Sequence, residues 1–103
     1  MKAGGKGQWM THVLWTALAT RDRQQVQSTG SSERDIAAME QRLAQQVAVL
    51  VRHPRLGRRG RIPGTREWVI ERDHVLVYEA WRDAIVILRL LHARQRWPAP
   101  PCD

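Results

Sequence analysis

The sequence predicts an α+β domain in which two N-terminal helices pack on a small antiparallel sheet, in the order β-α-α-β-β-β. Two observations carry this prediction: a helical hydrophobic period before Pro54, and three strand-like runs after it. Short turns between the runs indicate antiparallel neighbours. The chain has 103 residues, 43% of them hydrophobic, which suits one small domain built in two layers.

The N-terminal elements are a short strand and a helix. His12 to Trp15 (HVLW) is short, β-branched and aromatic, which favours a strand. Residues 16–27 contain few helix breakers and many good helix formers. Their apolar stripe is thin and consists of Ala17, Leu18 and Val26. The run STGSS at residues 28–32 then interrupts the pattern and predicts a break.

The second helix has the clearest local pattern. Ser32 is a capping residue type, and Asp35 follows it in nearly the capping-box position. Apolar residues then recur at spacings of three and four, which places them on one helix face: Ile36, Met39, Leu43, Val47 and Leu50. The opposite face should be solvated and carries Glu40, Gln41, Gln45 and Gln46. Pro54 ends the helix, which therefore runs to about Arg52.

The second half of the chain is predicted to be a basic loop followed by three strands. Residues 55–65 (RLGRRGRIPGT) combine arginines with glycines and a proline, which is typical of a loop. The strands expected after it are REWVIE at 66–71, HVLVYEA at 74–80 and AIVILRLL at 84–91. The last of these is almost entirely apolar, so we expect a central strand covered on both faces.

The charge of the chain points to an anionic partner. The formal net charge is +7, and the only lysines are Lys2 and Lys6. Arginine binds phosphates and carboxylates bidentately but is a poor proton donor, so a surface built from it favours anion binding. The single cysteine, Cys102, excludes an internal disulfide and a multi-cysteine metal site. We expect no metal and no cofactor.

The sequence also suggests where the domain begins and ends. Residues 1–9 (MKAGGKGQW) are expected to form a flexible leader, residues 10–98 a single domain, and residues 99–103 a short tail. No run reaches the length of about 18 apolar residues that indicates a membrane span, and the leader lacks the apolar core of a secretion signal. The expected location is therefore the cytoplasm, without a membrane partner.

The phrases HPRLGRRGR, PGTREWVI, HVLVYE and ILRLLHARQRWP, in this order, resemble the RelE/ParE superfamily of bacterial toxins from type II toxin–antitoxin systems. The resemblance covers roughly Leu14 to Pro98. It implies a small toxin that a cognate antitoxin holds inactive. RelE-like members cleave mRNA in the ribosomal A site, whereas ParE-like members poison DNA gyrase and are not nucleases. Because both use one fold, the fold does not choose between them.

Two features depart from the superfamily pattern. The first helix is shorter than in close relatives, and QSTGSSERD stands where they have a turn containing Asn-Pro. The RelE-type site uses lysines, arginines and a late tyrosine, but this chain has no lysine after Lys6, and its only tyrosine, Tyr78, lies inside a predicted strand. The ending LLHARQRWP, with an apolar-Leu-His step closing the last strand, is similar to ParE-like members.

The candidate site combines three catalytic residues with a basic surface. RNA cleavage needs an acid–base group, for which His92 and Asp73 are the candidates, and a phosphate clamp, for which Arg94 is the candidate. The residues proposed to bind nucleic acid are Arg58, Arg59, Arg61, Arg66, Arg96 and Trp97. Each candidate also has a purely structural interpretation. His92 would then be a histidine at a strand end, Asp73 a turn residue, the arginines surface residues, and Trp97 a cap of the core. Glu67 is an alternative partner for Arg61 or Arg66.

Three functions remain open at this stage. The favoured one is a ribosome-dependent mRNA endonuclease with ribosome and mRNA as partners. The alternative is a non-catalytic DNA gyrase inhibitor, and the third is a basic nucleic-acid-binding module without toxicity. All readings require the loop at 58–66 to lie beside residues 92–97.

Overall fold

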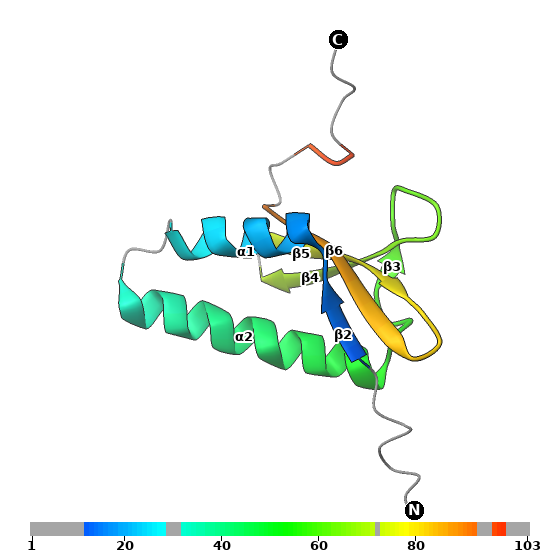
Figure 1. Ribbon diagram of the computed structural model, residues 1–103, viewed down its shortest axis with the longest axis horizontal. Helices are drawn as coiled ribbons and strands as arrows, with labels where there is room; N and C mark the ends of the chain where they lie inside the picture. The colour runs from blue at the N-terminus through cyan, green and yellow to red at the C-terminus, as the bar shows by residue number, and fades with distance from the viewer. Residues whose placement is uncertain (1–11, 29–31, 72, 93–95, 99–103) are drawn as a thin grey trace, which may run out of the picture.

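The computed structural model describes residues 12–28, 32–71, 73–92 and 96–98, so the leader and the tail expected from the sequence lie outside the described residues. Its elements follow the predicted order with one addition (Figure 1). They are β2 (His12–Trp15), α1 (Ala17–Ser28), α2 (Glu33–Arg52), β3 (Arg58–Arg59), β4 (Arg66–Glu71), β5 (His74–Ala80) and β6 (Ala84–His92).

The strands form one five-stranded sheet in the order β2-β6-β5-β4-β3. The three C-terminal strands pair antiparallel, as predicted. The first strand pairs parallel with β6, from His12 opposite Ala84 to Trp15 opposite Ile87, so the sheet is mixed rather than wholly antiparallel. The short β3 lies inside the segment predicted to be a loop, because two consecutive arginines carry no hydrophobic alternation that would reveal a strand.

The core lies between the helices and one face of the sheet. Leu43 and Leu50 of α2 are buried, and Ile36, Met39 and Val47 of the predicted stripe are half-buried. The sheet contributes Leu76, Tyr78, Ile85, Ile87 and Leu90. The capping prediction for α2 is confirmed, since the Ser32 hydroxyl accepts a hydrogen bond from the Asp35 amide at 3.1 Å.

Helix α1 occupies the edge of the sheet beyond the end of β2. Thr16 joins the two elements, because its hydroxyl donates to the Leu88 carbonyl at 3.0 Å and accepts from the Ala19 amide at 3.1 Å. The expected stripe was wrong for Ala17 and Leu18, which are exposed, whereas Ala19 and Asp22 are buried. Asp22 accepts a hydrogen bond from the Leu90 amide at 3.0 Å and so replaces the neighbouring strand that β6 lacks here.

Polar contacts join the helices to each other and to the sheet. Glu40 accepts hydrogen bonds from the Arg23 guanidinium and from the Gln27 side chain. Gln46 accepts a hydrogen bond from the indole nitrogen of Trp68 at 2.8 Å. The expectation that Glu40 and Gln46 are merely solvated was therefore wrong, because hydrophobic periodicity does not show which polar residues face a neighbouring element. Neither described helix is long and apolar enough to cross a membrane.

Candidate functional site

Charged residues form a row across the sheet on the face away from the core, called here the outer face. In register, Arg58 of β3 lies opposite Glu67 of β4, Glu67 opposite Val77 of β5, and Val77 opposite Arg89 of β6. Side chains alternate between the faces of a strand. Trp68, the neighbour of Glu67, hydrogen-bonds to helix α2, so Glu67 points the other way, onto the outer face.

Glu67 is the centre of this row, and its side chain is only 1% exposed. Its carboxylate accepts hydrogen bonds from the Arg58 guanidinium and from the Arg61 amide, both at 3.0 Å. The Arg61 guanidinium lies 3.6 Å away. Burial alone raises the pKa of Glu67, but these hydrogen bonds and the two positive charges bring that pKa below its ordinary value. Glu67 is therefore an ionised group that positions two arginines.

The basic loop and the C-terminal segment meet beside this row. The Arg61 guanidinium donates a hydrogen bond to the Trp97 carbonyl at 2.8 Å. The Arg89 guanidinium lies 5.5 Å from the centre of the Trp97 ring, in cation–π geometry. The Trp97 indole nitrogen is buried and has no hydrogen-bond partner among the described residues. Arg58, Arg61 and Trp97, remote in sequence, thus share one surface.

Arg89 is held in place from the helix side. Its guanidinium binds Asp22 of α1 with two hydrogen bonds, Nε to Oδ2 at 2.7 Å and Nη2 to Oδ1 at 3.1 Å. The hydrogen bond to Asp22 raises the pKa of Arg89, against the effect of burial. Sequence reasoning missed both residues. The available signal was a lone arginine within the apolar run ILRLL and a lone aspartate within the first helix.

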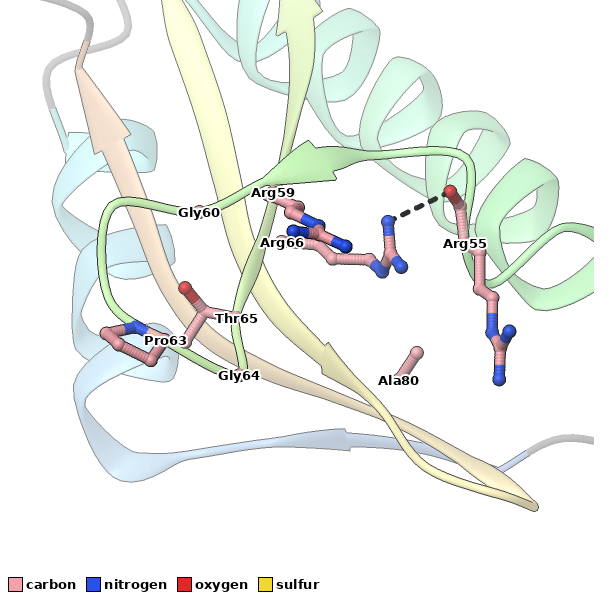
Figure 2. Close-up of a pocket in the computed structure, with 8 residues that line it drawn as sticks. All are labelled: Arg55, Arg59, Gly60, Pro63, Gly64, Thr65, Arg66 and Ala80. Carbon is pink, nitrogen blue, oxygen red and sulfur yellow. Dashed lines mark hydrogen bonds between the residues drawn. The ribbon is translucent and has the colours of Figure 1, made fainter.

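The other two loop arginines of the prediction lie elsewhere. Arg59 and Arg66 oppose each other in the register of β3 and β4, and both line a cavity of about 460 Å³ together with Arg55 (Figure 2). Because Arg59 follows Arg58 directly, its side chain points to the opposite face of β3. The predicted basic surface is therefore divided between two sides of the β3–β4 ribbon.

The acid–base candidates lie at one end of the sheet. His92 is opposite His74 in register, with ring centres 5.5 Å apart, and Asp73 precedes His74 in the turn. Arg89, which belongs to the charged row, lies three residues from His92 along β6, roughly 10 Å at the rise of a β-strand. Tyr78 is fully buried, and its hydroxyl donates to the Pro54 carbonyl at 2.7 Å. Arg94 lies outside the described residues, and Arg96 is exposed.

The family described as "ParE toxin of type II toxin-antitoxin system, parDE" matches residues 13–97. The chain belongs to the ParE toxin family. A curated relative of this ParE-family toxin is the Y4kP protein of Sinorhizobium fredii, which is named as a candidate toxin. The two are 34% identical over 89 residues, which make up 84% of this chain and 92% of Y4kP.

Solved structures share the fold of this ParE-family toxin. A chain of the chromosomal ParDE system of P. aeruginosa superposes with a TM-score of 0.69 at 23% identity, over 82% of this chain and 97% of that one. A chain of the RelBE2 toxin–antitoxin complex of Mycobacterium tuberculosis has a TM-score of 0.58 at 26% identity, over 81% and 98%. The predicted RelE/ParE-like fold and family are therefore confirmed.

Proposed function

We propose that this ParE-family toxin arrests growth by binding DNA gyrase through its outer face, without cleaving RNA. The observation that supports this proposal is the chemistry of the charged row. In the described part of the chain, the one carboxylate of the row is ionised and engaged by Arg58 and Arg61. An engaged carboxylate of lowered pKa is a poor proton donor at neutral pH, so the row is suited to binding rather than to acid–base chemistry.

The position of the histidine candidate also supports a binding role. His92 lies three residues from Arg89 along β6, roughly 10 Å at the rise of a β-strand, and Asp73 lies at the same end of the sheet as His92. General acid–base catalysis needs proton donor and acceptor within hydrogen-bond reach of the reacting atoms. A single nucleotide held at the row does not bring its ribose to His92.

Ribosome-dependent mRNA cleavage, which the sequence favoured, remains the second candidate because one feature suits it. Arg58 and Arg61 are 61% and 51% exposed, so both can bind an anion while they hold Glu67. Trp97, stacked beside Arg89, provides an aromatic surface of the kind that binds unpaired bases. In this function, His92, Asp73 and Arg94 remain the catalytic candidates.

The two functions are separated by assays in parallel on the purified toxin: supercoiling and DNA cleavage by gyrase, and mRNA integrity in a translating extract. We expect stalled gyrase–DNA cleavage complexes and intact mRNA. His92→Ala should retain the gyrase effect, whereas Arg61→Ala should reduce it at least about 10-fold, the scale of one lost hot-spot contact. Arg34→Ala, an exposed arginine of α2, is the matched charge control. Cut mRNA that depends on His92, with gyrase unaffected, would overturn the proposal.

We further propose that a cognate antitoxin neutralises the toxin. Solved relatives are described as toxin–antitoxin complexes, among them RelBE2 of M. tuberculosis and DinJ–YafQ of E. coli. The net charge of +7 favours an acidic antitoxin. Co-expression with the product of a neighbouring small reading frame tests this, because growth should be restored only when that product is present.

A further inference from the structure

Two arginines face each other across the β3–β4 ribbon on its core side. Arg59 and Arg66 are register partners, and Arg66 lies opposite the core residue Tyr78 in turn. Both line the same cavity of about 460 Å³, at which Figure 2 shows their guanidinium groups. Like charges directly opposite on two strands destabilise the pair. A multiply charged anion bound between the two guanidinium groups would offset this repulsion.

The walls of this cavity are organised in advance. The Arg66 Nη1 atom donates hydrogen bonds to the Gly57 carbonyl at 2.8 Å and to the Arg55 carbonyl at 3.2 Å, which fixes the guanidinium plane. Another wall is a turn closed by a hydrogen bond of 2.7 Å from the Gly60 amide to the Thr65 carbonyl. Groups that are held in place before binding lose little freedom when a ligand binds.

The cavity concentrates positive charge without a counter-charge of its own. It is lined by Arg55, Arg59 and Arg66, and no acidic side chain is among the described residues that line it. Glu67, next to Arg66 in β4, is held on the outer face by Arg58. Arginine binds phosphate oxygens in pairs, with two parallel N–H donors. The chemistry of this cavity, called here the arginine cavity, is therefore suited to a polyphosphate group.

A second hollow of about 820 Å³ continues the arginine cavity, because both include Arg55 and Ala80 in their walls. The second hollow has an apolar surface, since Leu56 is 47% exposed and Trp81 is 61% exposed. The Trp81 indole nitrogen donates a hydrogen bond to the Glu79 carboxylate at 2.8 Å, which orients the ring. An exposed aromatic ring held in one orientation is suited to stacking against a nucleobase.

We propose that the two hollows together bind one nucleoside polyphosphate, with its phosphates in the arginine cavity and its base on Trp81. The Glu79 carboxylate beside Trp81 disfavours any ligand that carries negative charge along its whole length, which applies to a nucleic-acid strand and to an acidic peptide alike. A nucleotide carries its charge at one end, and the amino group of its base can donate a hydrogen bond to Glu79. Arg52 and Arg82, also in the wall of the second hollow, add to the attraction for anions without selecting among them.

Isothermal titration calorimetry on the full chain, in a buffer free of magnesium, tests the proposal without gyrase, ribosomes or antitoxin. Its result is therefore independent of the proposed function. The probes are ATP and GTP, both of which carry an amino group on the base. Sodium tripolyphosphate supplies the phosphates without the base, and adenosine supplies the base without the phosphates. An oligothymidylate of about 12 nucleotides is the competing nucleic-acid strand.

We expect ATP or GTP to bind about 10-fold more tightly than tripolyphosphate, because stacking of the base adds to the phosphate contacts. Arg59→Ala should weaken the nucleotide and tripolyphosphate alike, about 10-fold, because both lose a charged hydrogen bond. Trp81→Ala should weaken only the nucleotide. Arg34→Ala, the exposed arginine of α2, should change neither affinity. The bound nucleotide should also raise the melting temperature, since it binds the folded state.

Three results would overturn the proposal. The first is no binding of either nucleotide at about 1 mM, or an affinity no higher than that of tripolyphosphate. The second is wild-type affinity for the nucleotide in Arg59→Ala or Trp81→Ala protein that circular dichroism shows to be folded. The third is displacement of the nucleotide by the oligothymidylate at an equal concentration of phosphate groups, which would assign the hollows to a nucleic-acid strand.

Discussion

At the scale of single residues, the outcome depends on which face of a short strand a side chain occupies. Arg58 and Arg59 are neighbours with the same chemistry. The first contacts a buried carboxylate on the outer face, and the second faces another arginine across a cavity. One step along a strand reverses the side-chain direction, so the run GRRGR supplies arginines to two different surfaces. Of these two arginines, Arg58 is the one that Glu67 holds in place.

Replacing Glu67 tests this role through the pH dependence of stability. The folded-state pKa of Glu67 lies below its ordinary value of 4.5, so its stabilising contribution is present above that pH and is lost as pH falls through the folded-state pKa. Glu67→Gln should lower the free energy of unfolding by about 2 kcal/mol at pH 7 and by much less at pH 3. Urea denaturation at the two pH values measures this.

Asp73→Asn, an exposed turn residue, serves as the control for that experiment and should change stability little at either pH. An equal loss of stability for Glu67→Gln at pH 7 and at pH 3 would show that the charge of Glu67 contributes nothing. Some acid sensitivity should persist in the variant, because the hydrogen bonds from Arg23 also lower the pKa of Glu40.

At the scale of elements, helix α1 is held to the sheet by a polar contact more than by an apolar stripe. Asp22 binds both the Arg89 guanidinium and the Leu90 amide, and the two paired side chains are only 8% and 19% exposed. The same arginine supports the Trp97 ring. The docking of α1 is therefore linked to the position of the C-terminal segment on the outer face.

Asp22→Asn should destabilise the fold by about 3 kcal/mol, because it leaves the largely buried Arg89 without its counter-charge. Thermal unfolding measures the loss. The near-ultraviolet circular dichroism of the tryptophans should change as well, since Trp97 loses the orientation of its neighbour. The exposed Glu33→Gln is a charge-matched control in α2, with an expected cost of at most about 1 kcal/mol. Wild-type stability in Asp22→Asn would refute the linkage.

The elements differ in how far the sequence predicts them. The period from Ile36 to Leu50 and the Pro54 boundary predict α2 almost to the residue, because hydrophobic spacing and helix capping are local signals. The pairing of β2 with β6, the contact between Arg61 and Trp97, and the Asp22–Arg89 bond join residues far apart in the chain. No local spacing encodes them. The arginines of the basic loop could be named from the sequence, but their division between two faces, and the contact of Arg89 with Asp22, required the strand register.

At the scale of the whole molecule, the arginines of the basic loop are divided between two sides of the β3–β4 ribbon. The outer face, with Arg58, Arg61, Arg89 and Trp97, is the proposed site of toxicity, whereas Arg55, Arg59 and Arg66 line a cavity on the other side. With only 103 residues and +7 net charge, the domain gains from a partner that buries surface and reduces the repulsion between its own charges. An acidic antitoxin segment does both.

The most direct measurement of this division is growth after induced expression of toxin variants in cells without antitoxin. Arg61→Ala should restore growth, because Arg61 lies on the outer face and contacts Trp97. Arg55→Ala, which alters only the cavity on the other side of the β3–β4 ribbon, should remain as toxic as the unchanged chain at equal protein level. Restored growth with Arg55→Ala and persistent arrest with Arg61→Ala would contradict the account.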